Sequence, residues 1–282
     1  MINWKIENHR GDILKHDGVE DFVVTKITGL NPPGANINTS ANTTTDGSKI
    51  NSVRLGNRNI VIYITINNDV EKTRIRLYQY FAVKKKLRLF FKNGTRNVFI
   101  DGYVEKVECD LFTKKQDMQI SIVCNNPYFK SLEEIACVFS DTQAGFEFPF
   151  DIQKEGIEFS TIIPSQRKSV MNEGEAETGL TIEIYARGTV INPILYDVGK
   201  RTNMKINFTM KASDKIVINT SVGEKSIILI RGGVSSNAMG YLDNGSSWLN
   251  IEPGENIFTY HSDEGNGNME ITFKTPLLYG GI

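Results

Sequence analysis

Residues 58–67 read RNIVIYITIN and place Ile60, Ile62, Ile64 and Ile66 on one side of an extended chain. Side chains of a β-strand point alternately to the two faces of a sheet, so this alternation predicts a strand with one buried face. The same period recurs downstream in KLRLFFK (86–92), KVECDLF (106–112) and QDMQISIVC (116–124). The first half of the chain is therefore predicted to form a sheet.

One helix is predicted among these strands, over residues 70–83. Asn68 and Asp69 are of the residue types that cap helix N-termini, and apolar residues follow at helical spacing. Ile75 and Tyr80 lie off that stripe, so the helix is apolar on more than one side. It either fills a thick core or contacts another subunit. The stripe consists of Val70, Leu77, Tyr78 and Phe81.

The segment NPPGANINTSANTTTDGSK, residues 31–49, holds prolines, glycines and small polar residues with little that could be buried. This composition predicts a long loop. Loops of this length are uncommon in compact domains and are often binding elements or disordered arms. The segment is therefore a candidate for reaching onto a neighbouring subunit.

The second half shows many short strand patterns separated by turn signals such as Gly223, Asn244–Gly245 and Pro253–Gly254. Short strands at this spacing predict an all-β sandwich. Because the first run of strands ends at Pro127, we expect a first domain over 1–130, a linker over 131–141 and a second domain over 142–282.

The composition indicates a globular protein without a charged surface that would attract a distant partner. In 282 residues, 40% are hydrophobic, and 32 Lys and Arg nearly balance 33 Asp and Glu. The first residues lack a signal-peptide pattern, and no apolar run reaches membrane-spanning length. Cys109, Cys124 and Cys137 lack metal-site spacing, and such cysteines suit a reducing cytoplasm.

The sequence holds no recognisable catalytic or cofactor-binding motif. His9, His16 and His261 are far apart in the sequence and outside metal-ligand spacings. Glu173, Glu175 and Glu177 share one polar stretch, which predicts a solvated loop rather than the paired carboxylates of a glycosidase or a set of calcium ligands. We therefore expect no enzyme activity, no cofactor and no metal.

Two further features have alternative interpretations. The basic run Lys84–Arg88 could contact phosphate groups, but lysines also protect the edge strand of a sheet from pairing. Trp248 either anchors the core of the second domain or stacks on a sugar.

The order of elements along the chain resembles the distal tail protein family, often called Dit, of long-tailed phages of Gram-positive hosts. The similarity spans essentially the whole chain and lies in turn residues and their order. In the first domain it rests on Gly29, Asn31–Pro33, Arg58–Ile60, Arg74, Leu77, Tyr78, Phe91, Asn93–Gly94, Asp101–Glu105 and Pro127–Phe129. In the second it rests on Asn172, Gly174, Gly179, Gly188, Asn192–Pro193, Thr220, Gly223, Ser247–Trp248 and Pro253–Asn256.

This resemblance implies a mainly β chain, with an N-terminal β-sandwich that carries one α-helix and a C-terminal galectin-like β-sandwich. It also implies a homohexameric ring in the tail tip or baseplate of a virion assembled in the host cytoplasm. The implied partners are the tail tube protein, a tail-associated hub protein and receptor-binding or baseplate proteins. DNA would pass through the lumen as cargo, and no membrane is involved.

A ring uses two different patches on each subunit. The breadth of the helix and the length of the loop predict that they supply these patches. The alternative function is a carbohydrate-binding module that recognises host cell-wall polysaccharide, with Trp248 as its stacking residue. The predicted interface residues are Asn36, Asn38, Val70, Arg74, Leu77, Tyr78 and Phe81.

Overall fold

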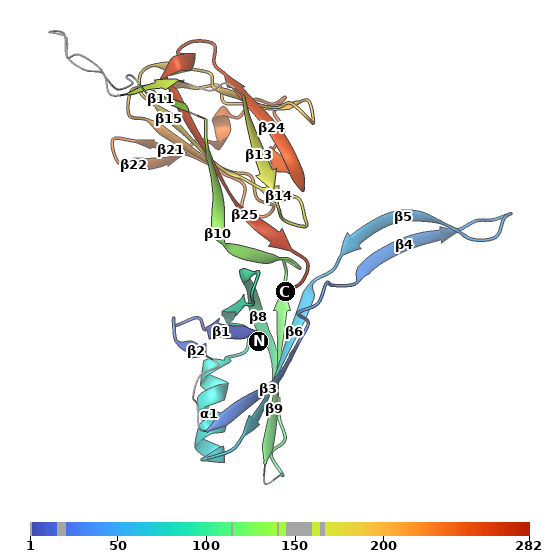
Figure 1. Ribbon diagram of the computed structural model, residues 1–282. Coiled ribbons are helices and arrows are strands. Elements are labelled where there is room, and N and C mark those ends of the chain that lie inside the picture. Colours follow the sequence, from blue (N-terminus) through green and yellow to red (C-terminus); the bar gives the residue numbers. More distant parts are fainter. Residues whose placement is uncertain (1, 16–20, 114, 140, 145–159, 164–166) are drawn as a thin grey trace. The chain divides into compact units, whose positions relative to one another are not determined.

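A computed structural model describes residues 2–15, 21–113, 115–139, 141–144, 160–163 and 167–282. This part of the chain is mainly β with one α-helix, α1 (Val70–Tyr80), as predicted (Figure 1). It divides into two compact units: unit 1 comprises Met1–Glu133 and Leu278–Ile282, and unit 2 comprises Glu134–Leu277. No helix in these described ranges has the length and apolarity that crossing a membrane requires.

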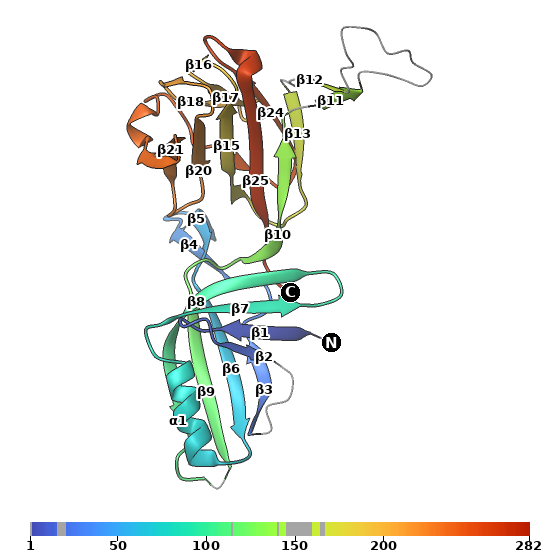
Figure 2. The same ribbon diagram turned by 90° about the vertical axis from the view of Figure 1, so that its left-hand side faces the viewer.

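Unit 1 is built on antiparallel strands in the order β2-β1-β7-β8-β9-β6-β3. Figure 2 shows β1 and β7 running across the direction of β6 and β9, so the sheet turns a corner. The strands are β1 (Asn3–Glu7), β2 (Ile13–Lys15), β3 (Phe22–Thr28), β6 (Arg58–Ile66), β7 (Lys86–Lys92), β8 (Asn97–Cys109) and β9 (Gln116–Cys124).

Strand β8 makes this corner, because its first half pairs with β7 and its second half with β9. At the bend, a Cβ on Gly102 would lie 2.6 Å from Ile122 Cγ2 and 2.8 Å from Cys124 Sγ. A side chain does not fit there, which explains the glycine. A register shift follows between Val104 and Lys106, and such bulges bend a strand.

The two halves of the bent sheet enclose one hydrophobic core, to which α1 contributes. The four isoleucines of β6 are at most 1% exposed, so the face predicted from their alternation is confirmed. Helix α1 begins after Asp69, which has left-handed backbone angles and makes no side-chain cap. The helix ends at Tyr80 rather than at Val83, and Phe81 follows it as the C-cap.

Unit 2 contains two main antiparallel sheets. One has the order β25-β15-β20-β21-β22 and the other β13-β24-β17-β18. The first consists of β15 (Thr181–Ala186), β20 (Lys215–Asn219), β21 (Ser226–Arg231), β22 (Val234–Asn237) and β25 (Met269–Tyr279), and the second of β13 (Arg167–Asn172), β17 (Ile194–Asp197), β18 (Thr202–Lys205) and β24 (Gly254–His261). Short pairs complete the unit: β11 (Asp141–Ala144) with β12 (Ser160–Ile163), β14 (Thr178–Gly179) with β23 (Asn250–Ile251), and β16 (Val190–Ile191) with β19 (Thr209–Met210).

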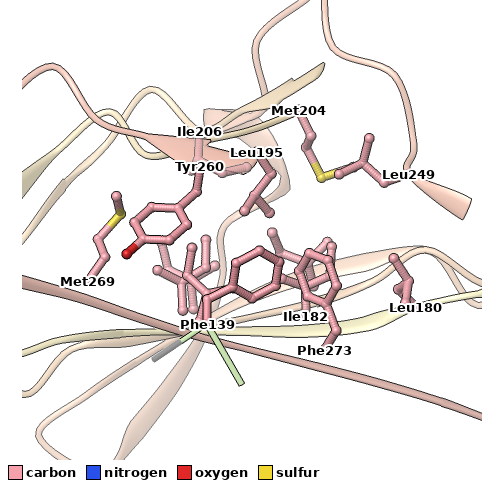
Figure 3. Packing of buried hydrophobic residues seen from close by; sticks show 14 of the residues in the cluster. Phe139, Leu180, Ile182, Leu195, Met204, Ile206, Leu249, Tyr260, Met269 and Phe273 are labelled. Atoms are coloured by element: carbon pink, nitrogen blue, oxygen red, sulfur yellow. The ribbon is translucent and has the colours of Figure 1, made fainter. Parts of the chain in front are cut away.

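The core of unit 2 lies between these sheets. Figure 3 shows Phe139, Ile182 and Phe273 facing Leu195 and Tyr260. The ring centroid of Phe139 is 4.8 Å from that of Phe273 and 5.8 Å from that of Tyr260, both with edge contacts. This packing agrees with a two-layer β architecture, and the galectin-like assignment stays a prediction.

The units differ from the expected domain ranges in two respects. Residues 131–141, expected to be a linker, lie mostly in strand β10 (Phe129–Val138), which pairs with β8 at Lys130 and Ser131. Residues 278–282 return to unit 1. Neither feature is visible in the sequence, because β10 carries polar residues at its centre and the return depends on long-range contacts. Separate folding of 1–130 and 142–282 stays a prediction.

Candidate interaction surface

The segment 31–49, expected to be a loop, forms most of an antiparallel hairpin of β4 (Ala35–Ala41) and β5 (Ser48–Leu55). We call residues 35–55 the arm. Every residue of β4 and β5 is exposed except Leu55, and Figure 1 shows the arm standing clear of the sheet of unit 1. A two-stranded hairpin is at best marginally stable alone in water. Among the described residues of unit 1, the arm therefore has no packing partner.

The register gives the arm two different faces. Val53 lies opposite Ile37 and Ile50 opposite Thr39, whereas Asn51 is left unpaired by a register shift. Directly opposite residues share a face, so this bulge returns Ile50 to the same side as Ile37. Without it, Ile50 would lie opposite Ser40. We call the resulting side the apolar face; it consists of Ala35, Ile37, Thr39, Ala41, Ser48, Ile50, Val53 and Leu55.

The other side of the arm is polar. Asn36 and Asn38, predicted as interface residues, both lie on it. The Asn38 side-chain amide donates to Ser52 Oγ at 3.0 Å. Lys49 and Arg54 are the charged residues of β4 and β5, so this polar face is basic. The sequence signal for the hairpin was weak because small polar residues occupy most positions.

Helix α1 contributes to the core more than expected. Leu77 is 2% exposed and Phe81 is fully buried, so neither can contact a neighbour, and their assignment to a surface patch is wrong. Val70 packs partly buried against the same core. Arg74 forms an ion pair with Glu71 across one helical turn, with Nη2 and Oε2 2.5 Å apart. The predicted residue that remains exposed on the helix is Tyr78, at 38%.

An apolar tip lies between β8 and β9. Phe112 is fully exposed and Leu111 is half exposed. Gln116 joins this turn to the helix, because its Nε2 donates to the Leu111 carbonyl at 3.3 Å and its Oε1 accepts from Arg74 Nη1 at 3.4 Å. The sequence pattern predicted Leu111 and Phe112 to lie in a strand. Their position after Asp110, in a hairpin turn, was the missed signal.

The arm is joined to the sheet by residues 29–34, its outgoing foot, and by residues 56–57, its returning foot. The two feet meet at a buried arginine, Arg58. Arg58 is 3% exposed and donates to four backbone carbonyls. Its guanidinium carbon lies 4.5 Å from the ring centroid of Phe129. Burial lowers the pKa of Arg58, although arginine remains cationic in proteins. The acceptors are Gly29 O at 2.5 Å, Asn31 O at 2.9 Å, Pro127 O at 2.7 Å and Gly280 O at 2.5 Å.

The residues considered for chemistry are dispersed. Glu177 forms an ion pair with Lys200 at 3.1 Å, while His16 lies outside the described residues. The described ranges hold no group of three or more histidine, cysteine or acidic side chains able to bind a metal. A groove of about 450 Å³ lies beside Tyr63, Glu108 and Asp117.

The remaining candidates have structural contacts. Lys86 and Arg88 both form ion pairs with Asp101, at 3.0 and 2.7 Å. Their strand β7 lies between β1 and β8, so the basic run does not protect a sheet edge. Trp248 packs partly buried against the core of unit 2, with Lys225 Nζ 5.1 Å from its ring centroid. A sugar would have to displace that lysine.

The three cysteines are free. Cys124 is fully buried, and this burial raises the pKa of its thiol to about 12. Cys109 and Cys137 are partly exposed. A thiol with a raised pKa is a poor nucleophile and metal ligand at neutral pH.

Comparisons with known proteins show what this chain is similar to. Residues 173–276 match the model of the siphovirus-type tail component, C-terminal domain. The crystal structure of SPP1 Dit, described as a paradigm of the hub adsorption apparatus in phages that infect Gram-positive bacteria, has a TM-score of 0.70 at 12% identity; the match covers 98% of this chain and 99% of that chain. Among curated proteins, no sequence matches.

Two baseplate structures are also similar. Chains of the phage P2 baseplate in its activated conformation, with Ca and with Sr, have TM-scores of 0.55 and 0.54. Each is 12% identical, and the match covers 100% of both chains. At this identity the likeness shows the fold. The family model matches the C-terminal part of this chain, and the fold of SPP1 Dit matches its whole length. These two findings confirm the resemblance of the chain to the distal tail (Dit) family.

Proposed function

We propose that the chain is a structural hub subunit of a phage tail tip or tail-like particle, without catalytic activity of its own. Six copies would form a ring that joins the tail tube to the receptor-binding apparatus. The fold shared with SPP1 Dit and with baseplate chains supports the hub role. The observation that carries the ring is the arm, whose apolar face has no partner in the described part of its own unit.

Each arm would pack its apolar face on the next copy. A closed ring requires two different patches per subunit, because each copy meets its two neighbours differently. Ile37, Ile50 and Val53 are 56–61% exposed. Full burial of such a side chain contributes roughly 1.5–3 kcal/mol. Burying the three side chains of one arm would therefore stabilise its contact with the next copy by several kilocalories per mole. The receiving patch on the neighbour would include Tyr78.

The remaining partners follow from the same proposal. The ring would contact the tail tube protein on one side and a tail-associated hub protein and receptor-binding or baseplate proteins on the other. Unit 2 would serve as a galectin-like attachment platform. DNA would pass through the lumen in a particle that carries it. The ring would lie at the virion tail tip and assemble in the host cytoplasm.

The first prediction concerns the two faces of the arm. In the full chain, Ile37→Asp with Val53→Asp places two charges on the apolar face, and we expect the ring to dissociate because these carboxylates would be buried at the contact. Multi-angle light scattering measures the mass.

The matched control is Ser40→Asp with Ser52→Asp, which adds the same charge to the polar face. This control should retain the ring. Rings of equal stability in both double variants would contradict the assignment of the apolar face to the contact.

A further inference from the structure

We propose that Arg58, Arg96 and residues 278–282 form a latch that holds both feet of the arm and sets the direction in which the arm leaves the sheet of unit 1. The purpose of the latch, which is to orient the arm for the contact between copies, rests on the proposed ring function. Its geometry belongs to unit 1 alone.

Arg58 is the centre of the latch. The arm and its two feet form an insertion between Thr28, the end of β3, and Arg58, the start of β6. The Arg58 side chain returns across this gap to the carbonyls of Gly29 and Asn31. One residue thus joins the outgoing foot of the arm to the returning foot.

The same guanidinium also holds the two connections to unit 2. It donates to Pro127 O just before β10 and to Gly280 O just after β25. The described residues supply no carboxylate partner for this cation, so carbonyl oxygens and the Phe129 ring provide its stabilisation. Removing the hydrogen bonds of a buried charge strongly destabilises the folded state, because the charge is left without compensation. Arg58 therefore favours a state in which all these segments are docked.

Residues 278–282 form the second half of the latch. Arg96 donates to the Gly281 carbonyl, and its guanidinium carbon lies 4.4 Å from the ring centroid of Tyr279. The Ile282 N–H donates to Leu30 O at 3.3 Å. A Cβ on Gly281 would lie 2.9 Å from Pro32 Cδ. The segment is thus seated directly against the outgoing foot.

The length of the arm makes this foot important. Strand β4 has 7 residues, so the arm extends about 23 Å at roughly 3.3 Å per residue. A change of about 10° at the foot would displace its tip by about 4 Å over that length. That exceeds the reach of a hydrogen bond. A fixed foot would therefore let the apolar face meet its partner in one register.

The second prediction tests the latch by the orientation of the arm in dissociated, full-length protein. Spin labels are attached at Thr44→Cys, in the arm turn, and at Thr95→Cys, in the turn between β7 and β8. Cys109→Ser and Cys137→Ser remove the accessible native thiols. Pulsed electron paramagnetic resonance then measures the distance distribution between the labels.

We expect one narrow distance in the parent and its loss in Arg58→Lys, which keeps the charge but not the planar fork. Gly281→Val should have the same effect through its clash with Pro32. Gly34→Val is the matched control, because a Cβ there meets no atom within 4 Å. It should retain the parent distribution.

Arg96→Met provides a milder variant if the others unfold, as judged by circular dichroism. Loss of a charge-assisted hydrogen bond should accelerate hydrogen exchange in peptides 29–34 and 278–282 by roughly tenfold or more. Parent-like distances and exchange in the folded latch variants would overturn the proposal. Ring formation by light scattering is scored separately, so a narrow distance without rings would refute the ring and leave the latch standing.

Discussion

At the scale of single residues, buried polar groups and glycines fix features that apolar patterns do not reveal. The Ile60 face could be predicted because alternation alone defines it. Gly102 and Arg58 could be recognised only as residue types, since their roles come from neighbours 20 to 222 positions away in the sequence. Tyr80 is similar: it accepts from the Leu14 N–H at 3.0 Å and donates to the Ile6 carbonyl at 2.6 Å.

The third prediction concerns Asp214 in unit 2. This buried carboxylate accepts two hydrogen bonds from Arg231, at 2.9 and 2.5 Å, and one from the Lys211 N–H at 2.7 Å. The bonds from Arg231 lower its pKa, and burial opposes them only in part. A lowered folded-state pKa stabilises above the unfolded-state value and loses that contribution as pH falls. Unit 2 should therefore lose stability below about pH 4.

Urea unfolding between pH 3 and 7 checks this expectation. A Trp4→Phe background leaves Trp248 as the fluorescent reporter of unit 2. Asp214→Asn should flatten the pH dependence, whereas Asp46→Asn, in the arm turn of unit 1, should not. An unchanged slope in Asp214→Asn would assign the acid sensitivity to other groups.

At the scale of elements, the sequence identified the elements that bury an apolar face and missed those that do not. Strand β6 and helix α1 were predicted because a core imposes their periods. The arm was predicted as a loop because β4 and β5 are almost entirely exposed and no core selects their residues. Its weak alternation of Ile37, Ile50 and Val53 becomes visible only once the bulge at Asn51 gives the register.

The fourth prediction separates the two roles considered for helix α1. Leu77→Ala should destabilise unit 1 by about 2–5 kcal/mol, because it opens a cavity in the core. Tyr78→Asp should change that stability by less than about 1 kcal/mol, because the side chain is partly exposed. It should nevertheless weaken the ring if the helix belongs to the receiving patch. Chemical unfolding and light scattering measure the two effects.

The Glu71→Gln variant serves as a control for charge on the same helix, since its carboxylate is exposed and forms only a surface pair with Arg74. Intact rings with Tyr78→Asp would exclude Tyr78 from the contact, and the exposed tip at Phe112 would then be the next apolar site of unit 1 to test.

At the scale of the whole molecule, the division into two units follows from two separate cores and not from a linker. Strands β10 and β25 both carry the chain across the division, and the last five residues return to unit 1. A linear pattern cannot show that return, because the contacts that hold these residues, such as that of Arg58 with Gly280, join positions far apart in the sequence. The sequence could name only the segments of a candidate surface, the helix and residues 31–49; the strand register then showed which side chains share a face of the arm. That this surface contacts another copy stays a prediction.

The central claim is that copies of this chain close into a ring through their arms. Negative-stain imaging of the purified full chain tests it most directly, with mass determination on the same sample. The account predicts six-fold rings with a central hole and a mass near six times 31.7 kDa. Monomers without rings at micromolar concentration would contradict it.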